Sequence, residues 1–495
     1  MLKKLNCFVW YNIDMLLEDY RNERLRKLEA LKERGIDVYP AKTHRNTKIS
    51  DVVNHFDEKQ GQKVTVAGRI VAIRSFGKLV FLKVRDYFGE VQIFMKANGE
   101  ETPEGLLSAK DVKLLDEGDF IEVTGIVDKS QTGEVSVFSD YVRLLTKTLR
   151  PLPDVFTNKE ERYRRRYVDL NVNKEVRDRL VRRSKFWQAT RDFMNAHGFV
   201  EINVPVLEHT TGGADATPFV THMNALDEDF YLRISHELPL KRLLGGGFEK
   251  VYDIGPRFRN EGIDDEHLPE HIAFEAYAAY EDYEDGMKFY EEMIKYVCKE
   301  TWGTLKFNVS GFEIDLDCEW PRYKYADLLK EHYGVDVFNP DREQLIQILK
   351  DNGVESNFDM TTPHLIDHVW KLIRKKSAGP FWVIDEPLSL SPLAKKSDKN
   401  PLVTERFHPV IAGTEMGNGF SELNDPLDQL ERFEEQQAAR DAGDEEAQML
   451  DMDFVEMLEY GMPPACGWGN SERNFWLLEG VSGREAVPFP VIKRA

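Results

Sequence analysis

Three carboxylates stand in semi-apolar stretches of this sequence, where a charged side chain is costly to bury. Glu237 lies in RISHELPL, Glu275 in IAFEAYAAY and Glu422 in NGFSELND. These stretches predict half-buried strands. Buried carboxylates are stable only when they are paired. They therefore either receive a cationic ligand or pair with nearby arginines, for which the candidates are Arg233, Arg242 and Arg257.

A second stretch with chemical potential is FRNEGIDDEHLPEH, at residues 258–271. It places one arginine, Arg259, among five carboxylates and two histidines. The Asn-Glu-Gly inside it predicts a turn between two extended runs. The residues alone leave the task of the arginine open.

The composition excludes several classes of protein. The chain has 495 residues, of which 41% are hydrophobic and 31% charged, and this suits about two to four domains with ample core. Its net charge of −21 means that a nucleic acid would have to bind at local basic patches. No apolar run approaches the ~20 residues of a membrane span, so no membrane partner is expected. The sequence also lacks GxxxxGK[ST], and no GxGxxG follows a strand.

The cysteines point to a compartment rather than to a metal. Cys7, Cys298, Cys318 and Cys466 are far apart and form no metal-binding spacing. Scattered thiols are typical of a reducing environment, so we expect a cytoplasmic protein.

The first part of the chain predicts a small barrel. Residues 1–14 form an extension of unknown role, and residues 15–62 form an N-terminal helix, at 16–35, and a lead-in. Residues 63–146 then read as five short strands with Gly-rich turns. This pattern suits a closed barrel of the oligonucleotide-binding (OB) kind.

The second part of the chain predicts one large α+β domain. A linker at 147–172 begins with two prolines in four residues and contains a basic run. Residues 173–495 mix long helical patterns with strand-like runs, and residues 320–378 look like a mostly helical insertion. The elements that hold the three carboxylates all belong to this domain.

Over about residues 16–495 the chain resembles the class II lysyl-tRNA synthetases of the bacterial type. HGFVEINVPVL resembles the first motif of the class, FRNEGIDDEHLPEH the second and GWGNSERNFWLL the third. TTGGADATPFVTHMNALDEDFYLRISHELPLKRLLGGG, GMPP and GNGFSELNDPLDQLERF resemble segments specific to the lysine enzymes. The resemblance implies an α+β fold, with an anticodon-binding OB-fold barrel followed by a class II catalytic domain. That domain would have an antiparallel sheet flanked by helices and a helical insertion.

The resemblance also implies the reaction. Such enzymes join L-lysine to ATP, release pyrophosphate and pass lysine from the adenylate to the 3′ end of tRNA(Lys). Two anions must be brought together, so charge neutralisation and positioning are the main tasks. Arg259 would bridge the lysine carboxylate and the α-phosphate, because its fork holds two oxygens at once. Arg473 would cover the adenine and reach the γ-phosphate, and Mg²⁺ would bind at Glu415 and Glu422, with His408 as a doubtful further ligand.

Other residues of the second motif would complete the ATP site. Glu261 would contact the adenine amino group or hold the hairpin, and His267 would lie near the phosphates. The position that stacks on adenine falls at His271. Asp264 and Asp265 are expected to form the solvated tip of the loop.

The acids would then divide by role in lysine binding. By the same resemblance, Glu237 and the backbone at Gly213 would take the α-ammonium, and Phe420 would pack on the aliphatic stem. The ε-ammonium would be surrounded by Glu275, Tyr277, Asn418 and Glu422. A hydrogen bond to a charged group is worth about 1.5–3 kcal/mol, so several together would reject a wrong side chain.

The barrel would read the tRNA anticodon. Family positions fall at Arg74, Phe81, Gln92 and Glu134. Phe81 would stack on a base, although on composition alone it reads as a core aromatic. Basic residues at 21–34 and 162–166 would contact phosphates, and the segment around Pro205 would form the interface of a homodimer.

The chain departs from the family pattern on the ATP side. A carboxylate is usual seven residues before Glu415, and here that position is His408, a poor ligand for magnesium. An arginine is usual at Glu266 and a phenylalanine at His271. The third motif, GWGNSER, is one residue shorter than usual. We therefore expect altered metal dependence.

Two other functions stay open at this point. One is a lysine ligase that modifies a protein, although such relatives lack the barrel. The other is a lysine-binding or tRNA-binding paralogue with an impaired ATP site.

Overall fold

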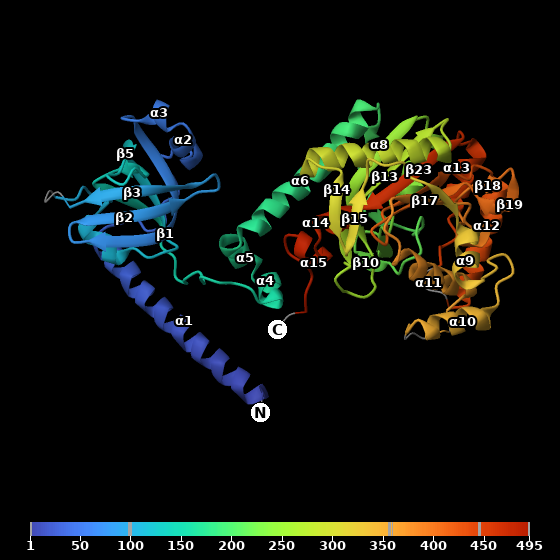
Figure 1. Ribbon diagram of the computed structural model, residues 1–495, viewed down its shortest axis with the longest axis horizontal. Coiled ribbons are helices and arrows are strands. Elements are labelled where there is room, and N and C mark those ends of the chain that lie inside the picture. The colour runs from blue at the N-terminus through green and yellow to red at the C-terminus, as the bar shows by residue number, and fades with distance from the viewer. Residues whose placement is uncertain (1, 98–100, 355–357, 359, 444–446, 494–495) are drawn as a thin grey trace. The chain divides into compact units, whose positions relative to one another are not determined.

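The computed structural model describes residues 2–97, 101–354, 358, 360–443 and 447–493, with the backbone alone for residues 2–16. The chain divides into two units, residues 1–156 and residues 157–495. Figure 1 shows the first unit in blue and cyan and the second from green to red.

The first unit is built around a barrel whose strands alternate between an apolar inner face and a more polar outer face. Its helices are α1 (Leu2–Glu33), α2 (Ile49–Asn54), α3 (Phe56–Lys59) and a 3₁₀ helix (Ala109–Leu114). Its strands are β1 (Lys63–Phe76), β2 (Leu79–Arg85), β3 (Glu90–Lys96), β4 (Leu107–Ser108), β5 (Phe120–Lys129), β6 (Val135–Phe138) and β7 (Tyr141–Thr146).

Strand pairing closes the barrel. The strands follow the order β1-β2-β3-β6-β5-β7-β4, and β1 also pairs with β5. Residues such as Leu82 and Ile93 fill the interior at 0% exposure. The barrel expected from the sequence is confirmed. Helix α1 begins at Leu2, earlier than the predicted position 16, so residues 2–14 continue the same helix.

The second unit is a layered α+β structure. Its helices are α4 (Lys159–Arg164), α5 (Arg166–Val172), α6 (Lys174–Ala196), α7 (Glu237–Gly245), α8 (Tyr283–Trp302), α9 (Tyr325–Tyr333), α10 (Arg342–Asp351), α11 (Thr362–Arg374), a 3₁₀ helix (Leu388–Leu390), α12 (Pro426–Asp441), α13 (Met452–Tyr460), α14 (Arg473–Glu479) and α15 (Gly483–Ala486). Its strands are β8 (Val200–Glu201), β9 (Leu207–Glu208), β10 (Phe219–Met223), β11 (Glu228–Leu232), β12 (Lys250–Phe258), β13 (Glu270–Ala279), β14 (Lys306–Val309), β15 (Phe312–Asp315), β16 (Arg322–Lys324), β17 (Phe381–Ile384), β18 (Lys396–Ser397), β19 (Asn400–Thr404), β20 (Arg406–Ile411), β21 (Thr414–Glu415), β22 (Asn418–Ser421) and β23 (Ala465–Ser471).

One large sheet organises this unit. Its strands follow the order β16-β17-β20-β22-β23-β13-β12-β8, with β21 beside β20. The pairings are antiparallel except those of β8 with β12 and β16 with β17. Helices α6 and α8 pack together against one face, around Phe274 and Trp468 (Figure 1). Helices α7, α12 and α13 cover apolar residues of the other face, including Tyr277 and Phe420.

Two expectations differ from the structure. Glu237 is the first residue of helix α7, not part of a strand, because the strand-like run ends at Leu232 and a short connection follows. Residues 159–172, expected in a linker, form helices α4 and α5. Arg166 is buried there and donates to Asp169 at 2.6 Å and to the carbonyl of Arg484 at 2.8 Å. The segment from 159 is thus packed into the second unit.

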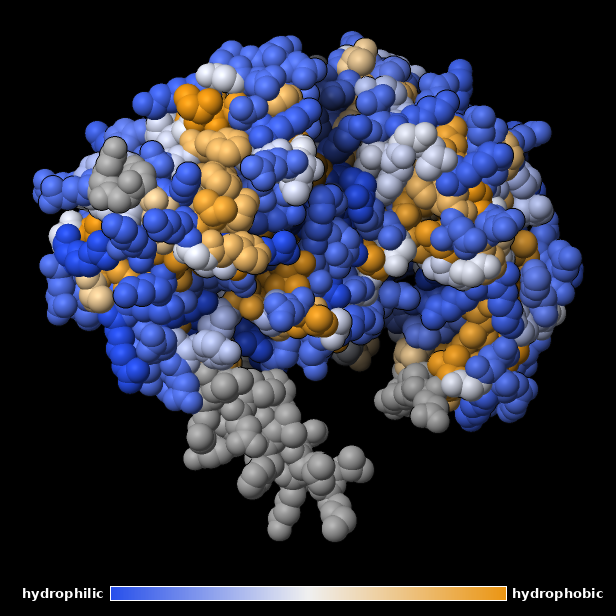
Figure 2. Space-filling view, turned by 60° about the vertical axis from the view of Figure 1, so that its left-hand side comes forward, coloured by the Kyte–Doolittle hydropathy of each residue, from blue (hydrophilic) through white to orange (hydrophobic). Residues whose placement is uncertain are grey.

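The surface is dominated by hydrophilic side chains on the face shown in Figure 2, with apolar residues in separate groups. This agrees with the net charge of −21. Among the helices of the described residues, none is long and apolar enough to span a bilayer.

A buried ion pair ties the end of the barrel to its core. The Nζ of Lys147, at 0% side-chain exposure, lies 2.7 Å from Oδ2 of Asp119 and 2.5 Å from Oδ2 of Asp116. Asp119 also accepts hydrogen bonds from the amide and hydroxyl of Thr148 at 2.8 and 2.9 Å. Removing one partner of such a cluster leaves a desolvated charge behind.

We predict that Lys147→Met destabilises the barrel by about 3–5 kcal/mol, because Asp119 would stay buried without its cation. The control is Lys83→Met, since Lys83 pairs with Glu90 at 3.1 Å on the surface, with 49% of its side chain exposed. That pair is worth no more than about 1 kcal/mol. Hydrogen exchange of β5 and β7 amides in the full chain measures both changes. If the β5 and β7 amides were equally protected from exchange in Lys147→Met and in Lys83→Met, the prediction would be contradicted.

Candidate active site

Glu237, Glu275 and Glu422 come from distant parts of the sequence and meet in one buried pocket. They are 6%, 6% and 1% exposed. Glu237 begins helix α7, Glu275 lies on β13, and Glu422 directly follows β22. The structure therefore brings together the three acids that the sequence singled out.

The register of the sheet aligns the rest of the predicted lysine site. Tyr277 of β13 stands opposite Gly467 of β23, which in turn stands opposite Phe420 of β22. In the next row, Glu275 stands opposite Gly469, which stands opposite Asn418. Asn418 is exposed and Phe420 is buried. The Tyr277 hydroxyl donates to Oε2 of Glu275 at 3.3 Å.

The glycines of β23 make room between these rows. A Cβ at Gly467 would lie 2.2 Å from Oε1 of Glu422 and 2.3 Å from the ring of Tyr277. A Cβ at Gly469 would lie 3.0 Å from Cγ of Glu275. Both glycines belong to the GWGNSER segment. The sequence did not predict that this segment borders the pocket of the three acids.

Gly213 lies against the same pocket. Its φ is +83°, and a Cβ there would lie 2.7 Å from Cβ of Glu237 and 2.8 Å from the hydroxyl of Ser235. Its amide donates to Oε1 of Gln448 at 3.2 Å. A side chain at position 213 is thus excluded by both backbone conformation and space.

Glu275 is held as a carboxylate by its neighbours. It accepts from the hydroxyl of Ser235 at 2.8 and 3.0 Å. His236 and Arg257 lie 3.6 and 3.5 Å from its Oε1. Burial would raise the pKa of Glu275, but His236, Arg257 and Ser235 together outweigh it and lower the pKa to about 2. Glu275 is therefore ionised at neutral pH.

The other two acids share an internal lysine that sequence reasoning missed. Nζ of Lys241, on helix α7, donates to Oε1 of Glu237 at 2.6 Å and forms an ion pair with Oε2 of Glu422. The i,i+4 spacing of Glu237 and Lys241 was a signal that could have found it. Burial raises the pKa of Glu422 well above its usual range, although Lys241 opposes this.

Pairing with arginine is thus confirmed for Glu275 alone among the three acids. Arg233 pairs instead with Asp253 at 3.1 Å, and Arg242 pairs with Asp451 at 2.8 Å.

The second predicted motif forms the hairpin of β12 and β13. Its strands pair from Lys250 with Ala278 to Phe258 with Glu270, and the Arg259 amide donates to the carbonyl of Pro269 at 2.9 Å. Arg259 is half-buried where the connecting loop begins, and Glu261 is exposed in that loop.

The acids at the tip of this loop are exposed, as expected, with 62% of the Asp264 side chain and 53% of the Asp265 side chain accessible, and each also has a local partner. Asp264 accepts from the amides of Glu266 and His267, both at 2.7 Å, and contacts Nδ1 of His267 at 2.9 Å. Asp265 contacts Nζ of Lys159 at 3.3 Å and Nη2 of Arg484 at 3.2 Å. The loop is thus closed internally by Asp264 and tied to α4 and α15 by Asp265.

His271 is held in one tautomer. Its Nε2 accepts from Nε of Arg257 at 2.8 Å, and its Nδ1 faces the carbonyl of Leu268 at 3.3 Å. Nδ1 therefore carries the proton. Burial and the charges of Arg257, Arg259 and Arg473 hold the pKa of His271 well below its usual range, so the ring is neutral.

Arg473 reaches the same loop from the first turn of α14. Its Nη2 donates to the backbone carbonyl of Glu266 at 3.1 Å, while the residue Glu266 itself is exposed. The exposed carboxylate of Glu266 also acts on Arg473 as an attractive charge, which opposes the lowering of the Arg473 pKa by burial.

The three predicted metal ligands do not gather. Glu422 pairs with Lys241, and Nε2 of His408 lies 2.7 Å from Oε2 of Glu386. Oε1 of Glu415 accepts from the Trp370 indole and lies 3.7 Å from Nε of Arg374. Within the described ranges, no three His, Cys, Asp or Glu side chains cluster as a metal site. Glu415 is the predicted ligand whose carboxylate suits a cation brought in by a substrate.

The predicted anticodon residues lie on the outer face of the barrel. Arg74 of β1 pairs with Phe81 of β2, and Phe81 pairs in turn with Phe94 of β3. Phe94 pairs with Phe138 of β6, so the four residues form one row across the strands. Phe81 is half-buried, and its ring centroid is 5.1 Å from that of Phe94. The alternative of a core aromatic at Phe81 is wrong, because Val80 and Leu82 fill the interior on either side.

The remaining barrel residues lie beside this aromatic row. Nε2 of Gln92 donates to the Ser136 hydroxyl at 2.9 Å, and that hydroxyl donates to the carbonyl of Glu134 at 3.0 Å. Glu134 is exposed. Sequence reasoning missed Phe94 and Phe138, although alternation with Ile93 and Val137 placed them on the outer face.

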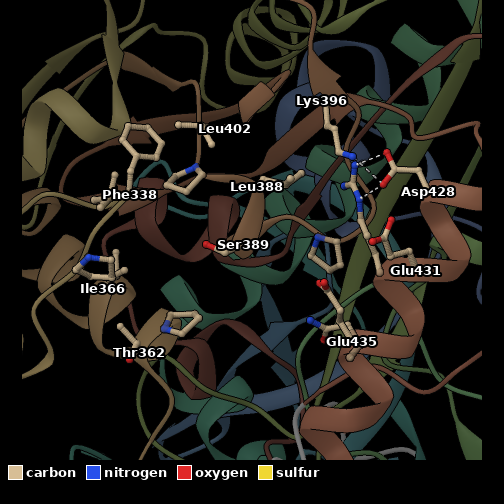
Figure 3. A pocket seen from close by; sticks show the side chains of 17 residues that line it. Phe338, Thr362, Ile366, Leu388, Ser389, Lys396, Leu402, Asp428, Glu431 and Glu435 are labelled. Atoms are coloured by element: carbon tan, nitrogen blue, oxygen red, sulfur yellow. Dashed lines mark hydrogen bonds and ion pairs between the residues drawn. The ribbon is translucent and has the colours of Figure 1, made fainter. Parts of the chain in front are cut away.

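A separate cavity of about 570 Å³ lies between the insertion and α12. Figure 3 shows Phe338, Ile366 and Leu402 on one side and acids of α12 on the other, where Asp428 pairs with Lys396 at 3.2 Å. None of the predicted site residues lines it. This cavity is therefore separate from the three acids and from the hairpin.

Comparison with known proteins agrees with this geometry. A model of the family described as "tRNA synthetases class II (D, K and N)" matches residues 158–493, and one described as "OB-fold nucleic acid binding domain" matches residues 64–145. Among curated proteins, the lysine–tRNA ligase of Thermotoga maritima is 42% identical over 489 residues, with 97% of each chain covered. That of Fervidobacterium nodosum is 43% identical over 488 residues, covering 97% of this chain and 95% of its own.

A third relative, the lysine–tRNA ligase of Thermoanaerobacter pseudethanolicus, is 42% identical and covers 99% of this chain and 98% of its own. The likeness thus extends over both units and nearly the whole length. The chain belongs to the class II tRNA synthetases of the D, K and N group, and within that group to the lysine–tRNA ligase family.

Proposed function

We propose that this chain activates L-lysine with ATP, forming lysyl-adenylate and pyrophosphate, and transfers lysine to the 3′ end of tRNA(Lys). The observation that carries the proposal is the buried group of Glu237, Glu275 and Glu422 beside a glycine-opened strand. Carboxylates at this depth suit a ligand with ammonium groups, because a cation offsets their desolvation.

The lysine pocket has a defined polarity. Glu237, with the backbone at Gly213, takes the α-ammonium of lysine, and Glu275, Tyr277, Asn418 and Glu422 surround the ε-ammonium. The ring of Phe420, buried between the two ends, packs on the aliphatic stem. A side chain without an ammonium would leave these acids unpaired, and this supplies the selectivity.

The ATP side brings the two anions together. Arg259 bridges the lysine carboxylate and the α-phosphate, and Arg473 covers the adenine and reaches the γ-phosphate. Glu261 and His267 belong to the loop over the nucleotide. The neutral ring of His271 stacks on adenine, since a neutral imidazole offers a π-face without repelling Arg257. In-line attack of the carboxylate on phosphorus then requires only positioning and charge neutralisation.

Magnesium would enter with the nucleotide. Mg²⁺ usually keeps several waters and binds through one or two carboxylates plus substrate phosphates. Glu415 fits that role, whereas His408 and Glu422 are engaged by Glu386 and Lys241. When bound, the ion would neutralise phosphate charge.

The barrel serves the tRNA. Its outer aromatic row, with Arg74, Gln92 and Glu134 nearby, offers a stacking surface and hydrogen-bonding groups for unpaired bases. The exposed basic residues of 21–34 would contact phosphates, as a chain of net charge −21 requires, whereas Arg166 of the run 162–166 is buried in its ion pair with Asp169.

A homodimer completes the proposed assembly. Apolar side chains are exposed near Pro205, with Val200 at 49%, Leu207 at 41% and Val220 at 60% exposure. Their burial in a second copy would stabilise the dimer. We place the assembly in the cytoplasm, where thiols such as Cys298 and Cys318, which are free, stay reduced.

The test of the proposal is lysine-dependent exchange of pyrophosphate into ATP, followed by charging of tRNA(Lys). We expect exchange with lysine and none with aspartate or asparagine, because the acids of the pocket would repel the aspartate carboxylate and would find no cation in the asparagine amide. Exchange without charging of tRNA would favour a lysine ligase that acts on protein. Lysine binding without exchange would favour a paralogue with an impaired ATP site, and would contradict the proposal.

Replacing the most firmly ionised acid tests the lysine pocket. We predict that Glu275→Gln lowers kcat/KM for lysine by about 10–150-fold, which corresponds to the roughly 1.5–3 kcal/mol of a hydrogen bond to a charged group. The exposed Glu313→Gln serves as the control. An unchanged kcat/KM in the Glu275 variant would exclude it from lysine binding.

Replacing His408, which stands where the family usually has a carboxylate, tests the metal dependence. His408→Glu would place a second carboxylate beside Glu386, and the two would repel unless a cation lay between them. We predict that half-maximal exchange then requires severalfold less Mg²⁺. His332→Glu on the exposed face of α9 adds the same charge elsewhere. Identical magnesium titrations for the two variants and the unaltered chain would refute the idea.

A further inference from the structure

We propose that Lys241 is a positioning residue that sets the charge selectivity of the lysine pocket. In this view, its ammonium cancels part of the negative charge and holds Glu237 and Glu422 by one oxygen each. The proposal rests on the proposed function and adds a residue that the site as described above does not assign to substrate binding.

The contacts of Lys241 support this role. Its side chain is 0% exposed, and its Nζ lies 2.6 Å from Oε1 of Glu237 and in an ion pair with Oε2 of Glu422. The same nitrogen stands over the ring of Phe420, 5.2 Å from the centroid. Lys241 therefore contacts the acids proposed for the two ends of the substrate, and also the ring proposed for its stem.

Glu422 is left open to a further cation. Its residue is 1% exposed, and neither carboxylate oxygen has a well-aligned hydrogen bond within the described part of the chain. Oε2 forms the ion pair with Lys241, and Oε1 lies against Gly467, where a Cβ would be only 2.2 Å away. A buried carboxylate with an unsatisfied oxygen is costly unless a ligand meets it.

The surroundings give Lys241 a distinct electrostatic task. Within the described residues, the charged or titratable groups that act on these acids include Glu275 and Tyr277 of β13, Arg406 of β20 and Cys466 of β23. Without Lys241, Glu237 and Glu422 would lose the cation that both contact, whereas Glu275 would keep Arg257. With Lys241, some negative charge still stays in excess for an incoming ammonium.

A purely structural role is the competing explanation, in which Lys241 only anchors helix α7. The two roles differ in one respect. If Glu422 is made neutral, the Lys241 ammonium loses one of its two carboxylate partners and keeps only the one at Glu237 among the acids of the pocket, so it repels the substrate ε-ammonium more strongly. Removing Lys241 as well should then restore part of the lost affinity, whereas removing a mere anchor should not.

The experiment is calorimetric titration of the full chain with L-lysine. The variants are Glu422→Gln and the double variant Lys241→Met, Glu422→Gln, in which the pair is replaced by neutral groups of similar length. The control is Arg242→Met, since Arg242 lies next on α7 and pairs with Asp451 outside the pocket. We expect the double variant to bind lysine about tenfold more tightly than Glu422→Gln, because one repulsive charge is removed. Arg242→Met should bind as the unaltered chain does.

The single variant Lys241→Met gives a second comparison. If Lys241 only anchors helix α7, its loss weakens lysine binding whether or not Glu422 is also replaced. If Lys241 sets the charge of the pocket, its loss strengthens binding only when Glu422 is already neutral.

The outcomes separate the two proposals. A double variant that binds lysine no better than Glu422→Gln would overturn the role of Lys241. Lysine binding by the unaltered chain without pyrophosphate exchange would overturn the proposed function alone. If Lys241→Met does not fold, the comparison of Glu422→Gln with the double variant still decides the question.

Discussion

The structure depends on the cost of holding several carboxylates in a space that water does not reach. Each buried charge loses its hydration, and like charges raise one another's pKa. The fold meets this constraint unevenly. Glu275 has Ser235, His236 and Arg257 and is firmly ionised, whereas Glu237 and Glu422 share Lys241. In the function that we propose, the incomplete compensation at Glu422 is what would make the pocket receptive to an ammonium group.

Strand alternation lets one strand serve both this pocket and the hydrophobic core. Phe274, Ala276 and Ala278 of β13 pack with α6 and α8, while Glu275 and Tyr277 point to the other face. If β13 paired one residue out of register, its apolar residues Phe274, Ala276 and Ala278 would face the pocket, and Glu275 and Tyr277 would face the hydrophobic core. The register with β23, where Gly467 and Gly469 stand opposite Tyr277 and Glu275, therefore fixes the site as well as the sheet.

The departures on the ATP side have local physical explanations. Glu266 is tolerated because its backbone carbonyl accepts from Arg473 and its carboxylate is an attractive charge for the same guanidinium. His271 is neutral because three arginines and burial lower its pKa. His408 has a partner in Glu386, and Arg406 lies 3.1 Å from the same Glu386 oxygen. A carboxylate is thus present beside position 408, although it comes from another segment and is already paired.

The sequence by itself determined the fold class, the barrel, the long helices and the residues of the family motifs, because periodicity and motif spacing are local properties of the chain. It also placed Glu275, Tyr277, Phe420 and Glu422 in one function through resemblance. Only the tertiary structure decided that Lys241 bridges Glu237 and Glu422. It also decided that Asp265 ties the loop between β12 and β13 to α4 and α15, and that Phe81 lies on the outer face of the barrel. The i,i+4 spacing of Glu237 and Lys241 is local, but the contact of Lys241 with Glu422 and the other two facts depend on which distant segments pack together and on strand register.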